Sequence, residues 1–157
     1  MLSFPALLGY SLYDADKLVP LSEEILYIQS YIDLHQLRYN NALYIQLELD
    51  GDTQVAIPAL ILITFVENAF KHGDLTDAQQ PLKIRIYSCD DALSVEITNK
   101  KGKRPIKSSG GIGIENIRKR LQLYYPERFT LEIYEPNECF DCHLKITAIS
   151  HAHPIQV

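Results

Sequence analysis

The sequence predicts an α+β fold in which helices cover one face of a mixed β-sheet. The first observation behind this fold class is the order of the patterns, which runs helix, strand, helix, two strands, glycine-rich loop, helix, two strands. This order lacks the strict alternation of a parallel doubly wound fold. The second observation is the length of 157 residues, which suits one domain with a sizeable core.

The first part of the chain carries two helix patterns and one strand pattern. Residues 1–13 have the pattern of the tail of a helix. A second helix is expected from Ser22, an N-cap residue followed by acids that suit the positive helix end, to about Tyr39. Residues 42–49 alternate between apolar and other side chains, which predicts a strand.

The middle of the chain carries a third helix and a hairpin. Ile57-Pro58 predicts the opening of this helix, because proline suits a first helical turn. Residues 59–72 are strongly apolar, and Gly73 is well placed to stop the helix. Residues 82–88 and 92–98 then predict a β-hairpin.

The last part of the chain starts with a polar segment, residues 100–109, which has the length of a functional loop. Gly110-Gly111-Ile112-Gly113 follows and leads directly into a helix pattern at 114–124. Residues 129–135 and 140–148 predict the final two strands.

Composition narrows the class of protein. The contents of 46% hydrophobic and 22% charged residues are ordinary for a soluble globular protein. A net charge of −5 gives no basic field to hold nucleic acid, so no nucleic-acid partner is expected. The sequence contains no run of 18 or more apolar residues, so it predicts no membrane-spanning helix. Cys139 and Cys142 have redox-pair spacing, but in a strand they would face opposite sides, which favours reduced cysteines of a cytosolic protein.

A first group of polar residues, Glu67, Asn68, Lys71 and His72, interrupts the end of the apolar third helix. Asn68 and Lys71 lie three apart and therefore share a face. The amide offers a metal an oxygen ligand and the lysine offsets phosphate charge, so the pair could serve a magnesium–phosphate assembly. The alternative is a helix end with solvated polar side chains.

The second group is the glycine-rich segment 110–113. Three glycines in four positions before a helix leave backbone N–H groups free to cradle phosphates. The segment is not a Walker loop, because no Gly-Lys-Ser/Thr follows, and it does not follow a strand as a dinucleotide fingerprint does. The alternative is a flexible loop before a helix.

Taken together, the two groups resemble the ATPase domain shared by histidine kinases, gyrase and MutL. The resemblance is closer to the LytS/YehU-type sensor kinases that partner LytTR response regulators. It implies a two-layer α/β sandwich of the Bergerat type with a mostly antiparallel sheet. The matching stretches are residues 19–24, 31–39, 57–60, 65–73 and 111–121, continuing through Tyr125-Pro126.

The resemblance also implies roles for single residues. Asn68 matches the magnesium-binding asparagine. Asn99 stands where many relatives place an aspartate that accepts a hydrogen bond from the adenine amino group, and it keeps an oxygen acceptor there. The usual Asp-x-Gly-x-Gly is replaced by Asn99-Lys100-Lys101-Gly102. Glu67 matches either a residue that activates the acceptor histidine or one that pairs with a neighbouring cation. The other nucleotide-binding positions it implies are Lys71, His72, Gly110, Gly111, Ile112, Gly113, Asn116 and Arg120.

The function implied by the resemblance is that of the ATP-binding catalytic domain of a two-component sensor histidine kinase, with ATP and Mg²⁺ as cofactors. The γ-phosphoryl group would pass to an acceptor histidine outside this chain, on the same or a partner subunit, and onward to a LytTR-type regulator. Residues 1–18 would be the truncated tail of the dimerisation region, and residues 19–157 the ATPase domain. His35 is expected to be a surface or half-buried helix residue and not the acceptor.

The whole protein would be a homodimer, with this part on the cytoplasmic side of a bacterial membrane. A degenerate, non-catalytic signalling or dimerisation module on the same fold remains the alternative, since the Asp-x-Gly-x-Gly is lost. A gyrase-type ATPase is disfavoured, because Thr64 stands where those enzymes carry a general base.

Overall fold

A computed structural model gives the fold and describes residues 17–103 and 111–151. The predicted helix tail at residues 1–13 lies outside these ranges. The helices and strands, in chain order, are β1 (Leu18–Pro20), α2 (Leu21–Arg38), β2 (Ile45–Gly51), β3 (Ala56–Pro58), α3 (Ile61–His72), β4 (Leu82–Cys89), β5 (Ala92–Lys100), α4 (Gly111–Tyr124), β6 (Phe129–Tyr134) and β7 (Cys139–Ile146).

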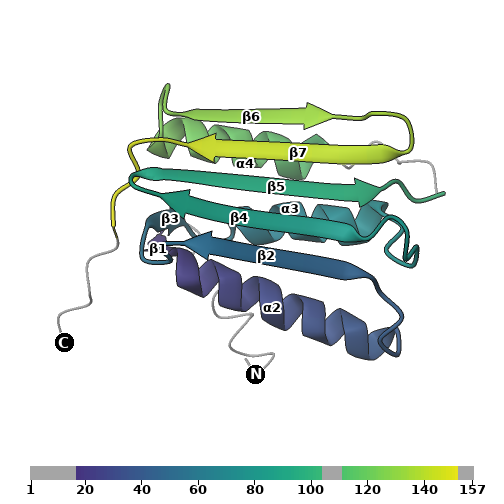
Figure 1. The fold of residues 1–157 in the computed structure, drawn as a ribbon. Helices are drawn as coiled ribbons and strands as arrows, with labels where there is room; N and C mark the ends of the chain where they lie inside the picture. Colours follow the sequence, from purple (N-terminus) through teal and green to yellow (C-terminus); the bar gives the residue numbers. More distant parts are fainter. Residues whose placement is uncertain (1–16, 104–110, 152–157) are drawn as a thin grey trace.

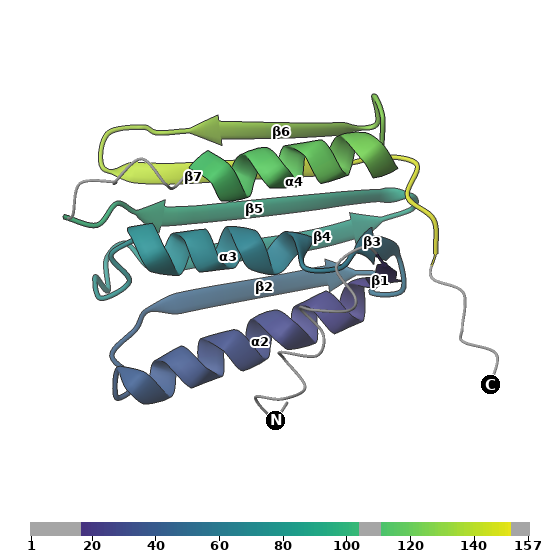
Figure 2. The ribbon, with the colours of Figure 1, turned by 180° about the vertical axis from the view of Figure 1, so that it is seen from behind.

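The main sheet has five strands in the order β2-β4-β5-β7-β6 (Figure 1). Only the β2–β4 pair is parallel, and the other pairs are antiparallel. Helices α2, α3 and α4 lie side by side on one face of this sheet (Figure 2). The predicted two-layer sandwich with a mixed, mostly antiparallel sheet is therefore confirmed. A small second sheet, β1 with β3, was not predicted.

The core lies between the sheet and the helix layer. Exposure alternates along β4, where Leu82, Ile84 and Ile86 are buried and the residues between them are exposed. The opposite face of the sheet carries a polar row across four strands, in which Arg85 lies between Glu48 and Glu96 and His143 follows Glu96. One face of each strand therefore meets the helices while the other meets solvent.

Two helix starts differ from the sequence prediction. Helix α2 begins at Leu21 without a side-chain cap, so Ser22 is not the N-cap; its backbone N–H donates to the Thr53 oxygen at 2.9 Å. Ile57-Pro58 ends strand β3 and does not open α3, because its backbone pairs with β1. The chain then turns through Leu60 in the left-handed region, at φ 66°, before α3 starts. Pairing with distant strands overrode the local proline signal.

The start of α3 is held by a side chain from α2. The Glu24 carboxylate is fully buried and accepts the Leu62 backbone N–H at 3.4 Å. The sequence assigned the first-turn acids to their own helix, but Glu24 reaches the N-terminus of α3. Burial raises the pKa of Glu24 to about 7, and the nearby Arg120 opposes that rise. The Arg120 guanidinium, on α4, donates to the Ala59 oxygen at 2.8 Å.

Gly73 caps the end of α3 as predicted, and the 82–98 hairpin and final two strands are confirmed. Helix α4 starts at Gly111, so the glycines at 111 and 113 belong to its first turn and not to a preceding loop. No helix within residues 17–103 and 111–151 is long and apolar enough to cross a membrane.

Candidate functional site

The candidate site forms at the C-terminal half of α3, which lies between α2 and α4 (Figure 2). The apolar residues of this helix, such as Phe65, Val66 and Ala69, are buried in the core. Glu67 and Lys71 are exposed, one turn apart, whereas Asn68 and His72 are half-buried. The helix thus anchors one face in the core and directs polar side chains toward its neighbours.

Asn68 meets the start of α4. A Cβ atom built on Gly113 would lie 3.8 Å from both amide atoms of Asn68 and 3.6 Å from Cγ2 of Thr64. The glycine leaves that space open, and the structure therefore brings the two sequence motifs face to face. The Nδ2 atom of Asn68 is buried and has no hydrogen-bond partner among the described residues.

Asn99, near the end of β5, is the second polar residue of the site. Its side chain is 3% exposed, and its Nδ2 donates to the Lys100 backbone oxygen at 3.0 Å. Its Oδ1 is buried and lacks a partner within the described part of the chain. With Nδ2 held, the amide keeps a free acceptor oxygen.

The last residues of α3 are tied to the residues after β5 by backbone hydrogen bonds. The Gly102 N–H donates to the His72 oxygen at 2.8 Å, and the Asp74 N–H donates to the Lys100 oxygen at 2.9 Å. A Cβ atom on Gly73 would lie 2.4 Å from the Ala69 oxygen, so only glycine fits there. These bonds fix α3 against the end of β5.

His72 adds a third unpartnered atom, because its Nε2 is buried without a hydrogen bond in the described residues. Buried polar atoms are nearly always hydrogen-bonded in native proteins, since each one left alone costs about 1–3 kcal/mol. Donors and acceptors gathered in this way on Asn68, His72 and Asn99 indicate a site that a polar ligand completes.

The remaining predicted residues are placed as follows. Asn116 is exposed on α4, in the turn after Gly113. Arg120 bonds Ala59, two residues before α3 begins, and so lies toward the other end of that helix. The backbones of Gly111 and Ile112 open α4, and Gly110 lies outside the described residues.

Two residues next to Asn68 bear on acid–base chemistry. Thr64 is no base, and its hydroxyl donates to the Leu60 oxygen at 2.8 Å. Glu67 is an exposed carboxylate whose pKa is raised by partial burial, which makes it a stronger base than a solvated glutamate.

Sequence reasoning did not single out Gly73 or Gly102 as parts of the site. The signal for Gly102 was its position in the segment that replaces Asp-x-Gly-x-Gly, but the backbone bond to His72 cannot be seen in one sequence. The cysteines are free, as expected, with Cys142 buried and Cys89 exposed. No cluster of three His, Cys, Asp or Glu side chains that could hold a metal occurs in the described ranges.

Comparisons with known proteins show which sequences this chain is similar to. A family model described as "Histidine kinase" matches residues 1–43. The sensor protein LytS of Bacillus subtilis is 28% identical over 132 residues, which cover 74% of this chain and 22% of LytS. The sensor histidine kinase YesM of the same species is 31% identical over 140 residues, covering 84% of this chain and 24% of YesM.

The fold also matches solved structures. The catalytic domain of histidine kinase ThkA superposes with a TM-score of 0.58 at 15% identity, covering 84% of this chain and 95% of that domain. At that identity the likeness concerns the fold. The chain spans less than a quarter of the length of LytS and YesM.

Proposed function

Because this chain belongs to the sensor histidine kinases of the LytS type, we propose that it binds ATP with Mg²⁺ and supplies the γ-phosphoryl group to an acceptor histidine outside the chain. The observation that supports this most directly is the set of buried polar atoms on Asn68, His72 and Asn99 that lack partners among the described residues, with Asn68 facing the space left by Gly113.

In this proposal Asn99 recognises the adenine base. Its buried Oδ1 accepts a hydrogen bond from the adenine amino group, and the Lys100 oxygen holds its Nδ2 on the other side. Gly73 leaves room beside Asn99, because a Cβ atom there would lie 2.8 Å from that Nδ2.

Asn68, Lys71 and His72 bind the phosphate groups. Asn68 offers a metal its amide oxygen and a phosphate oxygen its Nδ2, while the Lys71 ammonium offsets phosphate charge. The fit to Mg²⁺ rests on this oxygen donor beside open space. The bound ion would neutralise charge on the phosphate oxygens.

The start of α4 completes the phosphate site. Gly111, Ile112 and Gly113 present backbone N–H groups at a helix N-terminus, where the helix dipole favours an anion. Asn116 is exposed one turn further along and adds an amide to the same side.

Phosphoryl transfer depends chiefly on positioning and charge neutralisation, with attacking and leaving oxygen or nitrogen atoms in line. The acceptor nitrogen forms a bond to the γ-phosphorus as the bond to the ADP oxygen breaks. Glu67, exposed beside Asn68, accepts a hydrogen bond from the acceptor imidazole and favours the tautomer whose free nitrogen attacks.

The setting of the domain is part of the proposal. Residues 1–18 end a dimerisation region, and residues 19–157 form the ATPase domain of a homodimeric kinase. The domain lies on the cytoplasmic side of a bacterial membrane, and a LytTR-type response regulator receives the phosphoryl group.

Isothermal titration of this chain with ATP, with and without magnesium, tests the proposal. We expect saturable binding that magnesium strengthens. Absence of binding at millimolar ATP in both conditions would contradict it.

A second candidate is a non-catalytic signalling module on the same fold, favoured by Asn99 in place of the family aspartate. Phosphorylation of an acceptor-bearing helix supplied in trans distinguishes the two, because a non-catalytic module would bind nucleotide without transferring phosphate.

A further inference from the structure

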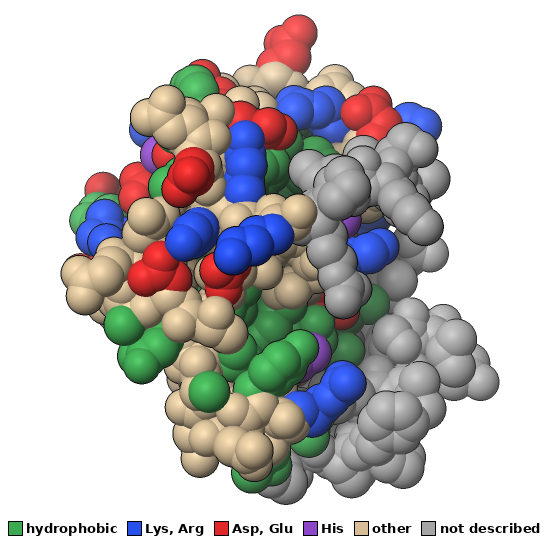
Figure 3. Space-filling model, turned by 90° about the vertical axis from the view of Figure 1, so that its right-hand side faces the viewer, with side chains coloured by type: hydrophobic (Ala, Val, Ile, Leu, Met, Phe, Trp, Pro, Cys, Tyr) green, Lys and Arg blue, Asp and Glu red, His purple; other side chains and the backbone are tan. Residues whose placement is uncertain are grey.

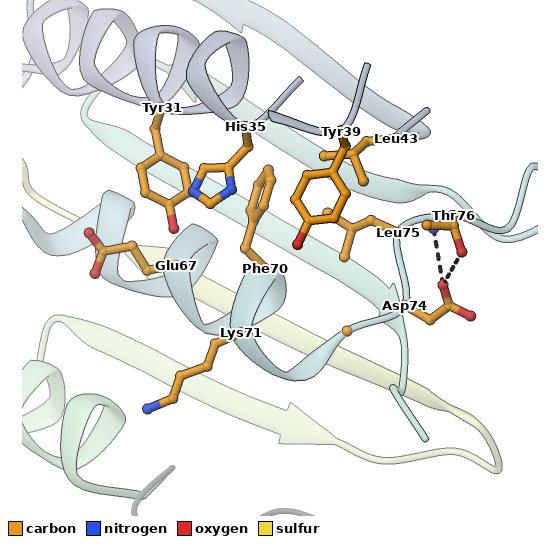
Figure 4. A pocket seen from close by; sticks show the side chains of 11 residues that line it. Tyr31, His35, Tyr39, Leu43, Glu67, Phe70, Lys71, Asp74, Leu75 and Thr76 are labelled. Atoms are coloured by element: carbon orange, nitrogen blue, oxygen red, sulfur yellow. Dashed lines mark hydrogen bonds between the residues drawn. The ribbon is translucent and has the colours of Figure 1, made fainter. Parts of the chain in front are cut away.

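A pocket between the C-terminal ends of α2 and α3 adjoins the proposed nucleotide site and shares Lys71 and Gly73 with it. Its volume is about 470 Å³, and Figure 4 shows its walls. Apolar and aromatic side chains form most of the lining: Tyr31, His35, Tyr39, Leu43, Phe70 and Leu75. The end of the molecule that carries these helix ends exposes apolar side chains beside a band of charged ones (Figure 3).

The aromatic wall is arranged before any partner binds. The His35 ring lies between Tyr31 and Phe70, with centroid distances of 4.5 Å and 4.7 Å, and Tyr31 meets Phe70 edge-on at 5.1 Å. Burial lowers the pKa of His35 and raises that of Tyr31 to about 12, so in both rings it favours the neutral form. His35 is thus a half-buried helix residue, as the sequence predicted.

The charged groups at the pocket do not favour a cationic occupant. The Asp74 carboxylate already accepts from the Thr76 N–H at 3.0 Å and from its hydroxyl at 2.6 Å. Figure 4 shows the Lys71 side chain extending away from the rings. Apart from Glu67 at one end, the lining is therefore mainly aromatic and apolar, which suits an apolar side chain.

Glu67 stands at one end of this pocket, with the Tyr31 hydroxyl directed toward it (Figure 4). In the proposed function Glu67 accepts a hydrogen bond from the acceptor histidine. Phe70 lies one turn further along α3, a rise of about 5 Å. A helix that presents its histidine to Glu67 and runs along α3 therefore sets its next turn over the pocket.

We propose that this pocket receives a large apolar side chain of the acceptor helix, one helical turn from its histidine. This docking contact rests on the proposed function. It orients the histidine beside Glu67, and the lining residues Tyr39 and Leu75 are not part of the proposed nucleotide site. A side chain that fills an aromatic pocket commonly supplies much of the binding free energy of such a contact.

Two variants of the pocket test the contact in the full-length kinase. Tyr39→Ala removes the side chain of a lining residue that is 50% exposed. Thr76→Trp places a large side chain into the pocket from an exposed position. Tyr87→Ala is the matched control, because Tyr87 is 49% exposed on β4, outside the pocket. We expect both pocket variants to phosphorylate the acceptor at least about fivefold more slowly, with the Kd for ATP within about twofold of the parent.

Wild-type phosphorylation rates in both pocket variants would overturn the docking contact while leaving the proposed function intact. Failure of the parent chain to bind ATP would overturn the proposed function itself. An equal loss of rate in Tyr87→Ala would show that the effect is not specific to the pocket, and would also overturn the inference.

The nature of the occupant is tested with N-acetyl-phenylalanine amide, N-acetyl-arginine amide and N-acetyl-alanine amide, titrated into the chain and followed by NMR. We expect the phenylalanine probe to shift the His35 ring signals most. A larger shift with the arginine probe would overturn the apolar assignment in favour of a basic side chain. If the chain formed a dimer and Tyr39→Ala abolished that dimer, the pocket would bind a second copy of the chain, and the inference would be overturned.

Discussion

The two ends of α3 differ in how their polar groups are used. At the N-terminal end, side chains from the flanking helices bond the backbone: Glu24 accepts from Leu62, and Arg120 donates to Ala59. At the C-terminal end, Asn68 and His72 each keep a buried polar atom without a partner in the described residues. The first end ties three helices together, whereas the second leaves donors and acceptors available to a ligand.

This difference shows that polar residues around the two ends of one helix can serve two purposes. Partners within the protein indicate a structural role, and buried atoms without partners beside open space indicate a ligand. Glu24 is the exception at the N-terminal end, because its Oε2 also lacks a partner in the described residues, and its carboxyl is therefore sensitive to pH.

The largest effect is expected at Glu24. Its pKa rises from 4.5 to about 7 on folding, so its contribution is fully present below about pH 4.5 and is lost as pH rises through about 7. The shift corresponds to roughly 3 kcal/mol in the free energy of unfolding. Glu24→Gln should remove this dependence and leave the variant more stable than the parent at pH 8.

Urea unfolding at pH 5 and pH 8 measures this effect. Glu23→Gln is the control, because Glu23 lies exposed in the same turn and should leave the pH dependence unchanged. If Glu24→Gln kept the parent's pH dependence, the structural reading of the N-terminal end would be wrong.

The next largest effect is expected at Arg120. Loss of its charged hydrogen bond to Ala59 in Arg120→Ala should lower the free energy of unfolding by about 2 kcal/mol, with little change in ATP affinity. Lys119→Ala, at an exposed neighbour, serves as control. A large loss of ATP affinity at unchanged stability would instead support the role near the phosphates that the family resemblance implies.

Asn68→Ala tests the C-terminal end. The variant loses the amide that we propose for Mg²⁺ and phosphate, so magnesium-dependent ATP affinity should fall at least about tenfold, or ~1.4 kcal/mol. Its thermal stability should change little, because the Nδ2 atom has no partner to lose in the described structure. Gln122→Ala, an exposed amide on α4, is the control, and an ATP affinity that matched it would contradict the metal role.

Gly113→Ala is expected to have the smallest effect on stability. The new methyl group would make ordinary contacts with Thr64 and Asn68, and alanine favours a helix by up to about 1 kcal/mol. ATP affinity should nevertheless drop by about fivefold, because the methyl group occupies the space in front of Asn68. Calorimetry of unfolding and ATP titration measure the two quantities separately.

Gly73→Ala is the matched comparison. Its methyl group would lie 2.4 Å from the Ala69 oxygen, so this variant, unlike Gly113→Ala, should have a lower free energy of unfolding than the parent. Equal stability of the two alanine variants would remove the distinction between a glycine needed for packing and one needed for a ligand.

Local patterns in the sequence determined most of the fold. The alternating residues of β4 and β5 and the apolar run of α3 each bury one face, so their periodicity alone predicts the layers. The same patterns placed Asn68 on a helix and the glycine segment directly before one, although Gly111 and Gly113 belong to the first turn of α4. The motif pair indicated the family.

Only the tertiary structure decided which polar groups have partners. Pairing with β1 turned Ile57-Pro58 into a strand, and the fold carried Glu24 to a helix start 38 positions away. It also set Asn68 against Gly113 and left the buried Oδ1 of Asn99 without a partner among the described residues. Such contacts depend on residues far apart in the chain, and a single sequence records the residue types but not the distances between them.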